Sequence, residues 1–283
     1  GLPANIFYGT GIPTIIVVLK QKRDNTDVLI IDASNGFIKE GKQNKLRASD
    51  IRKIADTVKY RRDIDKFSRK VSRDEIREND YNLNMPRYVD SSEAPESYDI
   101  YASMFGGIPK SEIEGLDKYW KAFPGLKEAL FDEISDTHMQ VKTDNVKDLI
   151  TDHENVVSFY NSYSKALSGF DMTMEKDLIE NMENVNIARE ENALAEELFE
   201  RLDDIALIDK YQAYQCMADE WTTISQDLET IRIDGKDTIT EVIPNMIEKK
   251  KNGKDIEVQD GWLGRIIPFE LVQNTILKEQ ADV

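Results

Sequence analysis

The sequence predicts an α+β fold that is mostly helical, and three observations support this. Two short apolar runs rich in β-branched residues lie near the N-terminus, at 15–19 and 28–31, as is typical of strands buried on both faces. Beyond residue 98 the apolar residues recur every three or four positions, which is the helical period. Between these parts lies a short polar linker, 91–97 (SSEAPES). We therefore expect two domains, 1–90 and 98–283.

The two apolar runs are expected to form a β-hairpin around a polar turn at 20–27. Two fully buried strands need further strands and covering helices around them, and the sequence offers no other convincing strand before residue 230. We therefore expect the hairpin to be the end of a larger sheet whose remaining strands lie outside this sequence. The chain also begins with Gly1 rather than Met, which suggests a truncated protein.

The helices are predicted from apolar spacing and from their capping residues. Ser49 is expected to open a helix, and Ser72 with Glu75 has the spacing of a capping box, in which each residue satisfies a free backbone amide. Ser111 with Glu114 has the same spacing. Longer helices are expected at 144–167, 174–202, 204–232 and 269–277, and a solvated loop at 249–254.

Charge divides the chain at the linker. The whole sequence carries 37 Lys and Arg against 54 Asp and Glu, a net charge of −17. Residues 1–90 carry 18 basic and 13 acidic side chains, a net charge of +5, so the remainder carries −22. The basic part can approach phosphate, whereas the acidic part is better suited to a protein partner or to solvent.

Several classes of protein are excluded by composition. The sequence has no apolar run of about 18 residues that could span a bilayer and no secretory signal, so we expect a cytoplasmic location. The single cysteine, Cys216, excludes an internal disulfide framework and is expected to be an inert core thiol. The two histidines, His138 and His153, are expected to be structural, so no metal site and no catalytic residue is predicted.

Specific strings resemble one protein family. Residues 2–14 (LPANIFYGTGIPT), residues 32–34 (DAS) with 41–46 (GKQNKL), and residues 79–88 (NDYNLNMPRY) follow one another in the order found in the modification subunits of type I restriction–modification systems. Weaker similarities continue at 106–109 (GGIP), 119–124 (YWKAFP), 260–262 (DGW) and 268–272 (PFELV).

The resemblance implies the C-terminal part of an adenine-specific DNA methyltransferase. Its fold would be the C-terminal β-hairpin and helices of a truncated Rossmann-like catalytic domain, followed by a helical tail for subunit interaction. Such enzymes transfer a methyl group from S-adenosylmethionine to an adenine that has left the base stack. The family's glycine-rich cofactor loop and Asn-Pro-Pro-aromatic loop are missing from this sequence. We therefore expect this part alone to bind no cofactor and to be inactive.

The resemblance also implies binding residues and partners. Phe7, with Tyr8 beside it, matches the family's aromatic residue that stacks on the displaced base, and the alternative is that Phe7 packs against its own sheet. Double-stranded DNA, the specificity subunit and the restriction subunit are the implied partners. Candidates for contact with the DNA backbone are Arg61, Arg62, Arg69, Lys70 and Arg87, although unspecialised surface charge is an alternative. Candidates for contact with the specificity subunit are Leu207, Tyr211, Tyr214, Trp221 and Leu228, although a role in the chain's own core is an alternative.

Two other function classes remain open at this point. The chain could be a free-standing acidic helical interaction protein, for example a DNA mimic, but such a protein would not begin with two unsupported core strands. It could also be an intact enzyme of another kind, which the lack of plausible nucleophiles, bases and metal ligands disfavours.

Overall fold

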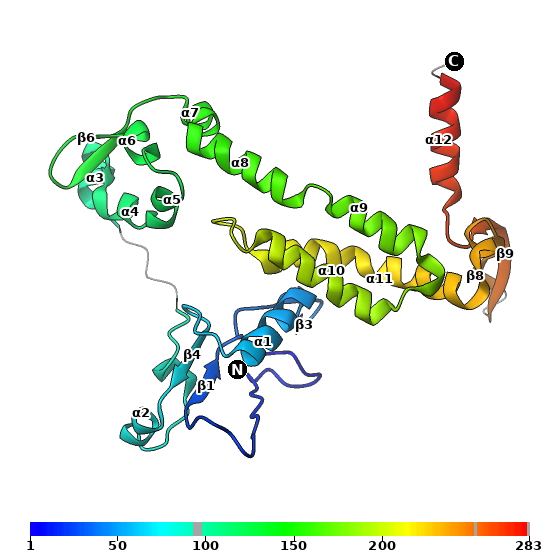
Figure 1. Cartoon of the computed structure of the whole chain (residues 1–283), viewed down its shortest axis with the longest axis horizontal. Coiled ribbons are helices and arrows are strands. Elements are labelled where there is room, and N and C mark those ends of the chain that lie inside the picture. The colour runs from blue at the N-terminus through cyan, green and yellow to red at the C-terminus, as the bar shows by residue number, and fades with distance from the viewer. Residues whose placement is uncertain (93–97, 252–253, 282–283) are drawn as a thin grey trace. The chain divides into compact units, whose positions relative to one another are not determined.

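The computed structural model describes residues 1–92, 98–251 and 254–281 (Figure 1). Helices and antiparallel strands make up its regular structure, so the expected α+β, mostly helical class is confirmed. The chain forms two compact units. One comprises Gly1–Ala166 with Leu202–Ala218, and the other comprises Leu167–Arg201 with the described residues from Asp219 onward. Most of the linker expected at 91–97 lies outside the described residues, and the boundary there stays a prediction.

The predicted N-terminal hairpin is not formed. Strand β1 (Val28–Ile31) pairs with β4 (Ser68–Val71) in an antiparallel ladder, not with residues 15–19. Apolar side chains on this ladder pack with those of the segments that follow it, and the resulting core contains Ile30, Val71, Ile76, Tyr88 and Val89. The second predicted strand is therefore confirmed, but its partner lies forty residues away in sequence.

Residues 15–19 form no strand, although their composition predicts one. All five side chains are exposed, from 62% for Val18 to 90% for Leu19. A strand is stable only when its backbone groups are paired, and no described strand pairs with these residues. The prediction that this chain pairs them with 28–31 is therefore wrong.

Several short elements follow β1 in the first 92 residues. Strands β2 (Ile38–Glu40) and β3 (Gln43–Lys45) form a hairpin, which leads into helix α1 (Ala48–Tyr60). Helix α2 (Arg73–Glu78) begins as predicted, because the Ser72 hydroxyl accepts a hydrogen bond from the Glu75 amide. A 3-10 helix, η1 (Met85–Arg87), lies where extended chain was expected.

Between residues 98 and 167, small helices surround a three-stranded antiparallel sheet of order β5-β7-β6. Its core contains Phe123, Leu126, Leu130 and Val156. The helix predicted over 144–167 is two helices, because His153 has an extended backbone that separates them. The elements are α3 (Ile100–Phe105), β5 (Ile108–Pro109), α4 (Lys110–Glu114), α5 (Asp117–Ala122), α6 (Leu126–Leu130), β6 (Phe131–Glu133), β7 (His138–Val141), α7 (Val146–Asp152) and α8 (Glu154–Leu167).

The next segment is helical, as predicted, with different bounds. The helix expected at 174–202 is divided among several elements, of which α10 is the longest, and the helix expected at 204–232 begins later. Leu207 has a left-handed backbone, with φ of 64°, and lies in the turn before that helix. The elements are α9 (Phe170–Met174), η2 (Glu175–Glu180, a π-helix), η3 (Met182–Asn184), α10 (Ile187–Leu202) and α11 (Lys210–Asp234).

A long β-hairpin and a final helix end the described chain. After the short helix η4 (Lys236–Ile239), strands β8 (Val242–Lys251) and β9 (Lys254–Gly264) pair in antiparallel fashion. The solvated loop predicted at 249–254 is therefore wrong, because the lysines of that run lie in the ladder. Residues 252–253 lie outside the described part. Helix α12 (Phe269–Ala281) confirms the helix expected there.

Candidate nucleic-acid interface

The aromatic residues predicted to stack on a base lie on a closed loop, residues 2–14, which we call the aromatic loop. An isolated bridge joins its two ends, where the Leu2 amide donates to the Thr14 carbonyl at 2.8 Å. A turn near its tip brings the Thr10 amide to 3.4 Å from the Phe7 carbonyl, with Gly9 at a φ of 80°. The loop thus displays its aromatic side chains, with Phe7 55% exposed and Tyr8 94% exposed. Base stacking by Phe7 and Tyr8, and the alternative that Phe7 packs against its own sheet, both stay predictions.

The β2–β3 hairpin, residues 38–45, supports one arm of this loop. The Asn44 side-chain amide donates to the Ala4 carbonyl at 2.8 Å, and the Asn44 backbone amide donates to the Asn5 carbonyl at 2.9 Å. The hairpin also carries three lysines, so we call it the lysine hairpin. Sequence reasoning missed the role of Asn44, because nothing local in the sequence signals a contact across forty residues.

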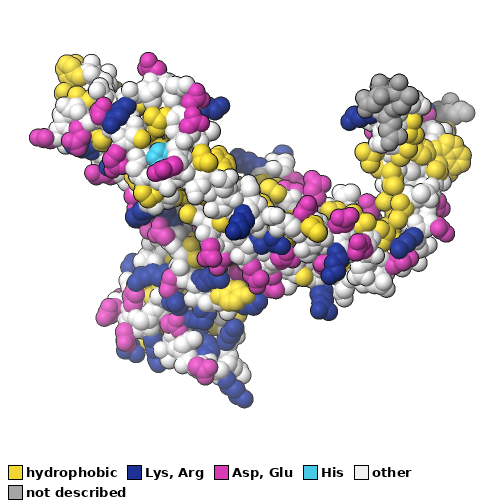
Figure 2. Space-filling model, turned by 45° about the horizontal axis from the view of Figure 1, so that its top comes forward, with side chains coloured by type: hydrophobic (Ala, Val, Ile, Leu, Met, Phe, Trp, Pro, Cys, Tyr) yellow, Lys and Arg dark blue, Asp and Glu magenta, His cyan; other side chains and the backbone are white. Residues whose placement is uncertain are grey.

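Basic side chains gather over the part of the molecule formed by residues 1–92, shown in dark blue in the lower part of Figure 2. Within the lysine hairpin, Lys45 forms an ion pair with Glu40 at 3.0 Å. In the described part of the chain, Lys39 and Lys42 form no ion pair and are exposed. These two cations were not singled out from the sequence, yet they lie on the element that supports the aromatic loop.

The five cations predicted to contact the DNA backbone each interact with a group of this chain. Arg69 forms a two-pronged contact with the Glu75 carboxylate, at 2.9 and 3.0 Å, and such paired charges are less available to phosphate. The hydrogen bond from Arg61 lowers the pKa of Asp27 below its usual value. Their DNA role stays a prediction. The other contacts are Arg61 with Asp27 at 2.7 Å, Lys70 with Asp63 at 3.1 Å, Arg87 with the Asn79 side chain at 3.3 Å, and Arg62 over the Tyr60 ring at 4.9 Å.

Asp32, which directly follows strand β1, joins this strand to Ser91 near the end of the segment 1–92. Its buried carboxylate accepts hydrogen bonds from the Ser91 hydroxyl at 2.7 Å and the Ser34 amide at 3.0 Å. Burial acts to raise the pKa of Asp32, but these hydrogen bonds outweigh it and lower the pKa below its usual value. Because the ionised form accepts these bonds, Asp32 serves as a structural anchor rather than as a proton donor.

Four of the five residues predicted to contact a specificity subunit are buried within this chain. Leu207 is 39% exposed, whereas the other four are 5–9% exposed. The Tyr211 hydroxyl donates to the Asp56 carboxylate at 3.3 Å. Burial, with the Asp56 charge, raises the pKa of Tyr211 to about 12. Their contact with a partner stays a prediction, and their place in the chain's own core is observed for Tyr211, Tyr214, Trp221 and Leu228.

The described residues offer no group of three or more His, Cys, Asp and Glu side chains that could hold a metal ion. The His138 ring is buried. Its Nε2 lies 3.4 Å from the Asp99 carboxylate and its Nδ1 lies 2.9 Å from the Thr137 hydroxyl, consistent with a structural role.

Cys216 is exposed, so the expectation of a core thiol is wrong. It lies on α11 between the buried Tyr214 and Trp221, but on another face of the helix. No described helix is both long and apolar enough to cross a membrane.

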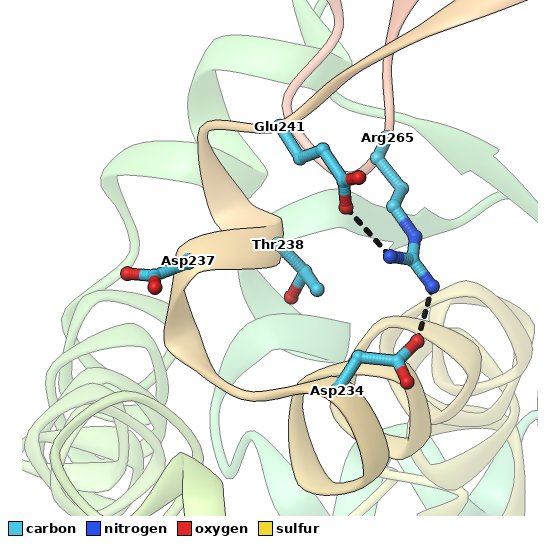
Figure 3. Close-up of a pocket in the computed structure, with 5 residues that line it drawn as sticks. All are labelled: Asp234, Asp237, Thr238, Glu241 and Arg265. Carbon is cyan, nitrogen blue, oxygen red and sulfur yellow. Dashed lines mark hydrogen bonds and ion pairs between the residues drawn. The ribbon is translucent and has the colours of Figure 1, made fainter.

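A shallow polar cavity lies at the junction of α11, η4 and the end of β9 (Figure 3). Arg265 extends between Asp234 and Glu241 and forms an ion pair with each, at 2.6 Å to Glu241. These bonds raise the pKa of Arg265 above its usual value. Asp237 and Thr238 complete the lining. Because both prongs of the guanidinium are occupied, we assign the cluster a structural role in fastening the β8–β9 hairpin to α11.

Comparison with known proteins confirms the resemblance found in the sequence. Residues 1–97 match the N-6 DNA Methylase family. The MpnII type I restriction enzyme methylase subunit of Mycoplasma pneumoniae is 42% identical over 100 residues, covering 35% of this chain and 18% of that protein. The MjaVIII methylase subunit of Methanocaldococcus jannaschii is 36% identical over 124 residues, covering 42% of this chain and 21% of that protein.

A solved structure is similar to about a third of the chain. It is the methyltransferase subunit of a type I restriction–modification system from Streptococcus thermophilus, 54% identical over 32% of this chain and 20% of that one, with a TM-score of 0.32. The matched part of this chain thus spans about a fifth of the length of its curated relatives. Over a third or more of its length, this chain is therefore similar to type I methylase subunits.

Proposed function

We propose that this chain is the C-terminal part of a type I modification subunit, and that it supplies the target-base side of an adenine-N6 DNA methyltransferase. In this proposal the parent enzyme takes its methyl group from S-adenosylmethionine, which is held by a catalytic region preceding residue 1. The residues of this chain bind no cofactor. They receive the displaced adenine, contact the DNA and join the subunit to its partners.

The observation that carries the proposal is the exposure of residues 15–19. Burying an apolar side chain of this size contributes roughly 1.5–3 kcal/mol, so five consecutive ones left 62–90% exposed are costly in water. Their β-branched composition suits a strand covered on both faces. A sheet built from the residues that the relatives have and this chain lacks would supply both the pairing edge and the cover. A free-standing acidic interaction protein would have no use for such a segment.

The aromatic loop supports the assignment to the target-base side. An adenine must leave the duplex to react, and a displaced base is held by stacking on flat side chains. Phe7 is more than half exposed on a loop closed at its base. Phe7 lies eight positions before the segment proposed to join the catalytic sheet, and the bridge between Leu2 and Thr14 keeps its loop next to that segment. The ring would therefore lie near the edge of that sheet.

The positive charges of residues 1–92 support a role beside the DNA backbone. In the β2–β3 ladder, Lys39 lies opposite Asn44, and residues paired in this way project from the same face of a hairpin. Lys39 is therefore placed on the side of the hairpin that supports the aromatic loop. With Lys42 at the turn, it would neutralise phosphates flanking the displaced base. The specificity subunit would read the sequence, and the restriction subunit would join the same complex.

Reconstitution tests the proposal. The chain is co-expressed with the polypeptide encoded directly upstream and with the specificity subunit, and N6-methyladenine in cognate DNA is measured by mass spectrometry. We expect methylation only when all three are present. Val18→Asp should abolish it, because a charge on a buried strand prevents joining to the sheet. Lys20→Asp, in the neighbouring polar segment, is the matched control. Methylation of equal rate without this chain would contradict the proposal.

A further inference from the structure

The aromatic loop has few attachments to the rest of the described chain, and Asn44 makes two of them. Its backbone and side-chain amides donate to consecutive carbonyls, those of Asn5 and Ala4, at 2.9 and 2.8 Å. Asn5 has a left-handed backbone, with φ of 55°. The two bonds therefore hold the loop at the residue where it turns, two positions before Phe7.

The side chain required for this contact is specific. The Ala4 carbonyl can only accept a hydrogen bond, so its partner must be a donor of asparagine's length. Asp at position 44 would have nearly the same shape but would direct an acceptor at that carbonyl. Ala would remove the bond. Asn44 is itself half-buried and held in the β2–β3 ladder opposite Lys39, so its position is fixed by the hairpin.

We infer that Asn44 is a positioning residue for the target base, acting through the aromatic loop. The inference rests on the proposed function, because it requires Phe7 to stack on the displaced adenine. In the free chain Asn44 keeps the arm of the loop against the lysine hairpin. In the complete enzyme the same two bonds fix the position of the Phe7 ring relative to the displaced adenine. A small displacement of this ring would move the adenine away from its reactive position and slow the reaction.

The contact is tested first in the chain alone, by hydrogen exchange of the backbone amides. Asn44→Asp should speed exchange of the residue-44 amide, which donates to the Asn5 carbonyl, and of the Leu2 amide, which donates across the base of the loop. The amides of β1 and β4 should stay protected. The matched control is Gln43→Ala, because residue 43 projects from the other face of the strand. Unchanged exchange in Asn44→Asp would overturn the inference whatever the function of the chain.

The role in the reaction is tested in the reconstituted methyltransferase. We expect Asn44→Asp to lower kcat for cognate DNA by about 10- to 100-fold, with the KM for S-adenosylmethionine unchanged. Combined with Phe7→Ala, it should add little further loss, because both changes remove the same stacking contact. Fully multiplicative losses would overturn the inference, since Asn44 would then act independently of Phe7. Normal methylation in Phe7→Ala would instead contradict the proposed function itself, so the two failures are distinguishable.

Discussion

Replacing Phe7 with Ala is expected to lower the methylation rate of cognate DNA by about 5- to 150-fold in the complete enzyme. Stacking of a base on an aromatic side chain contributes about 1–3 kcal/mol, and that range corresponds to this loss of rate if the contact is present in the transition state. Phe7 is exposed on the aromatic loop, so its removal leaves no cavity in this chain. Binding of S-adenosylmethionine should be nearly unchanged.

Two variants of the same loop make this result specific. Phe7→Tyr keeps the ring and should retain most of the activity, whereas Ile12→Ala removes an apolar side chain that is 69% exposed elsewhere on the loop and should have little effect. Single-turnover methylation with tritiated cofactor measures the rate of the chemical step. An unchanged rate in Phe7→Ala would show that this ring does not stack on the base.

Replacing Trp221 with Ala is expected to lower the free energy of unfolding of the isolated chain by about 3–5 kcal/mol. Trp221 is 6% exposed on α11, and truncation of a buried indole loses its burial and leaves a cavity. Denaturant titration followed by circular dichroism measures the loss. Leu207, which is 39% exposed in the turn before α11, is the matched control, and Leu207→Ala should cost less than about 1 kcal/mol.

The two possible roles of Trp221, as a core residue or as a contact to the specificity subunit, predict opposite results. If Trp221 belongs to the core, its loss is seen in the chain without any partner. If it is a partner contact, Trp221→Ala should leave the stability of the chain within about 1 kcal/mol and weaken binding to the specificity subunit instead. The second pattern would contradict the assignment to the core.

Local signals in the sequence predicted part of the local structure. Ser49 and Ser111 were expected to open helices, but they lie inside α1 and α4, which begin at Ala48 and Lys110. The capping pair Ser72 and Glu75 begins a helix as expected, and the helical period beyond residue 98 corresponds to real helices. The strings in residues 2–14 and 41–46 pointed to the family that the comparisons found. These signals depend on residues a few positions apart, whose interactions follow from the helical and strand periods themselves.

Pairing between distant segments could not be predicted in the same way. Strand β4 reads SRKV, and its two central residues are charged, so nothing marks it as the partner of β1. The lysines at 249–251 lie in the long β8–β9 ladder. The side chains of Lys249 and Lys250 are exposed there, so the charged run resembled a loop. Asn44 likewise gave no signal, because its two acceptors are backbone carbonyls, which carry no sequence information.

Residues 15–19 show a different limit. Their composition predicts a buried strand, and in this chain they are exposed and unpaired. The composition and the exposure of residues 15–19 agree if the segment is stable as a strand only inside a sheet that this sequence does not contain. A hydrophobic pattern therefore predicts the environment in which a segment is stable, whichever polypeptide segment supplies that environment.

Hydrogen exchange at the amides of residues 15–19 tests the central claim most directly. In the chain alone these amides should exchange as fast as those of an unstructured peptide, because no described residue accepts a hydrogen bond from them. In the complete modification subunit they should be strongly protected, as in a central strand of a stable sheet. Equally fast exchange in both samples would contradict the account, because this segment would then not belong to the catalytic sheet.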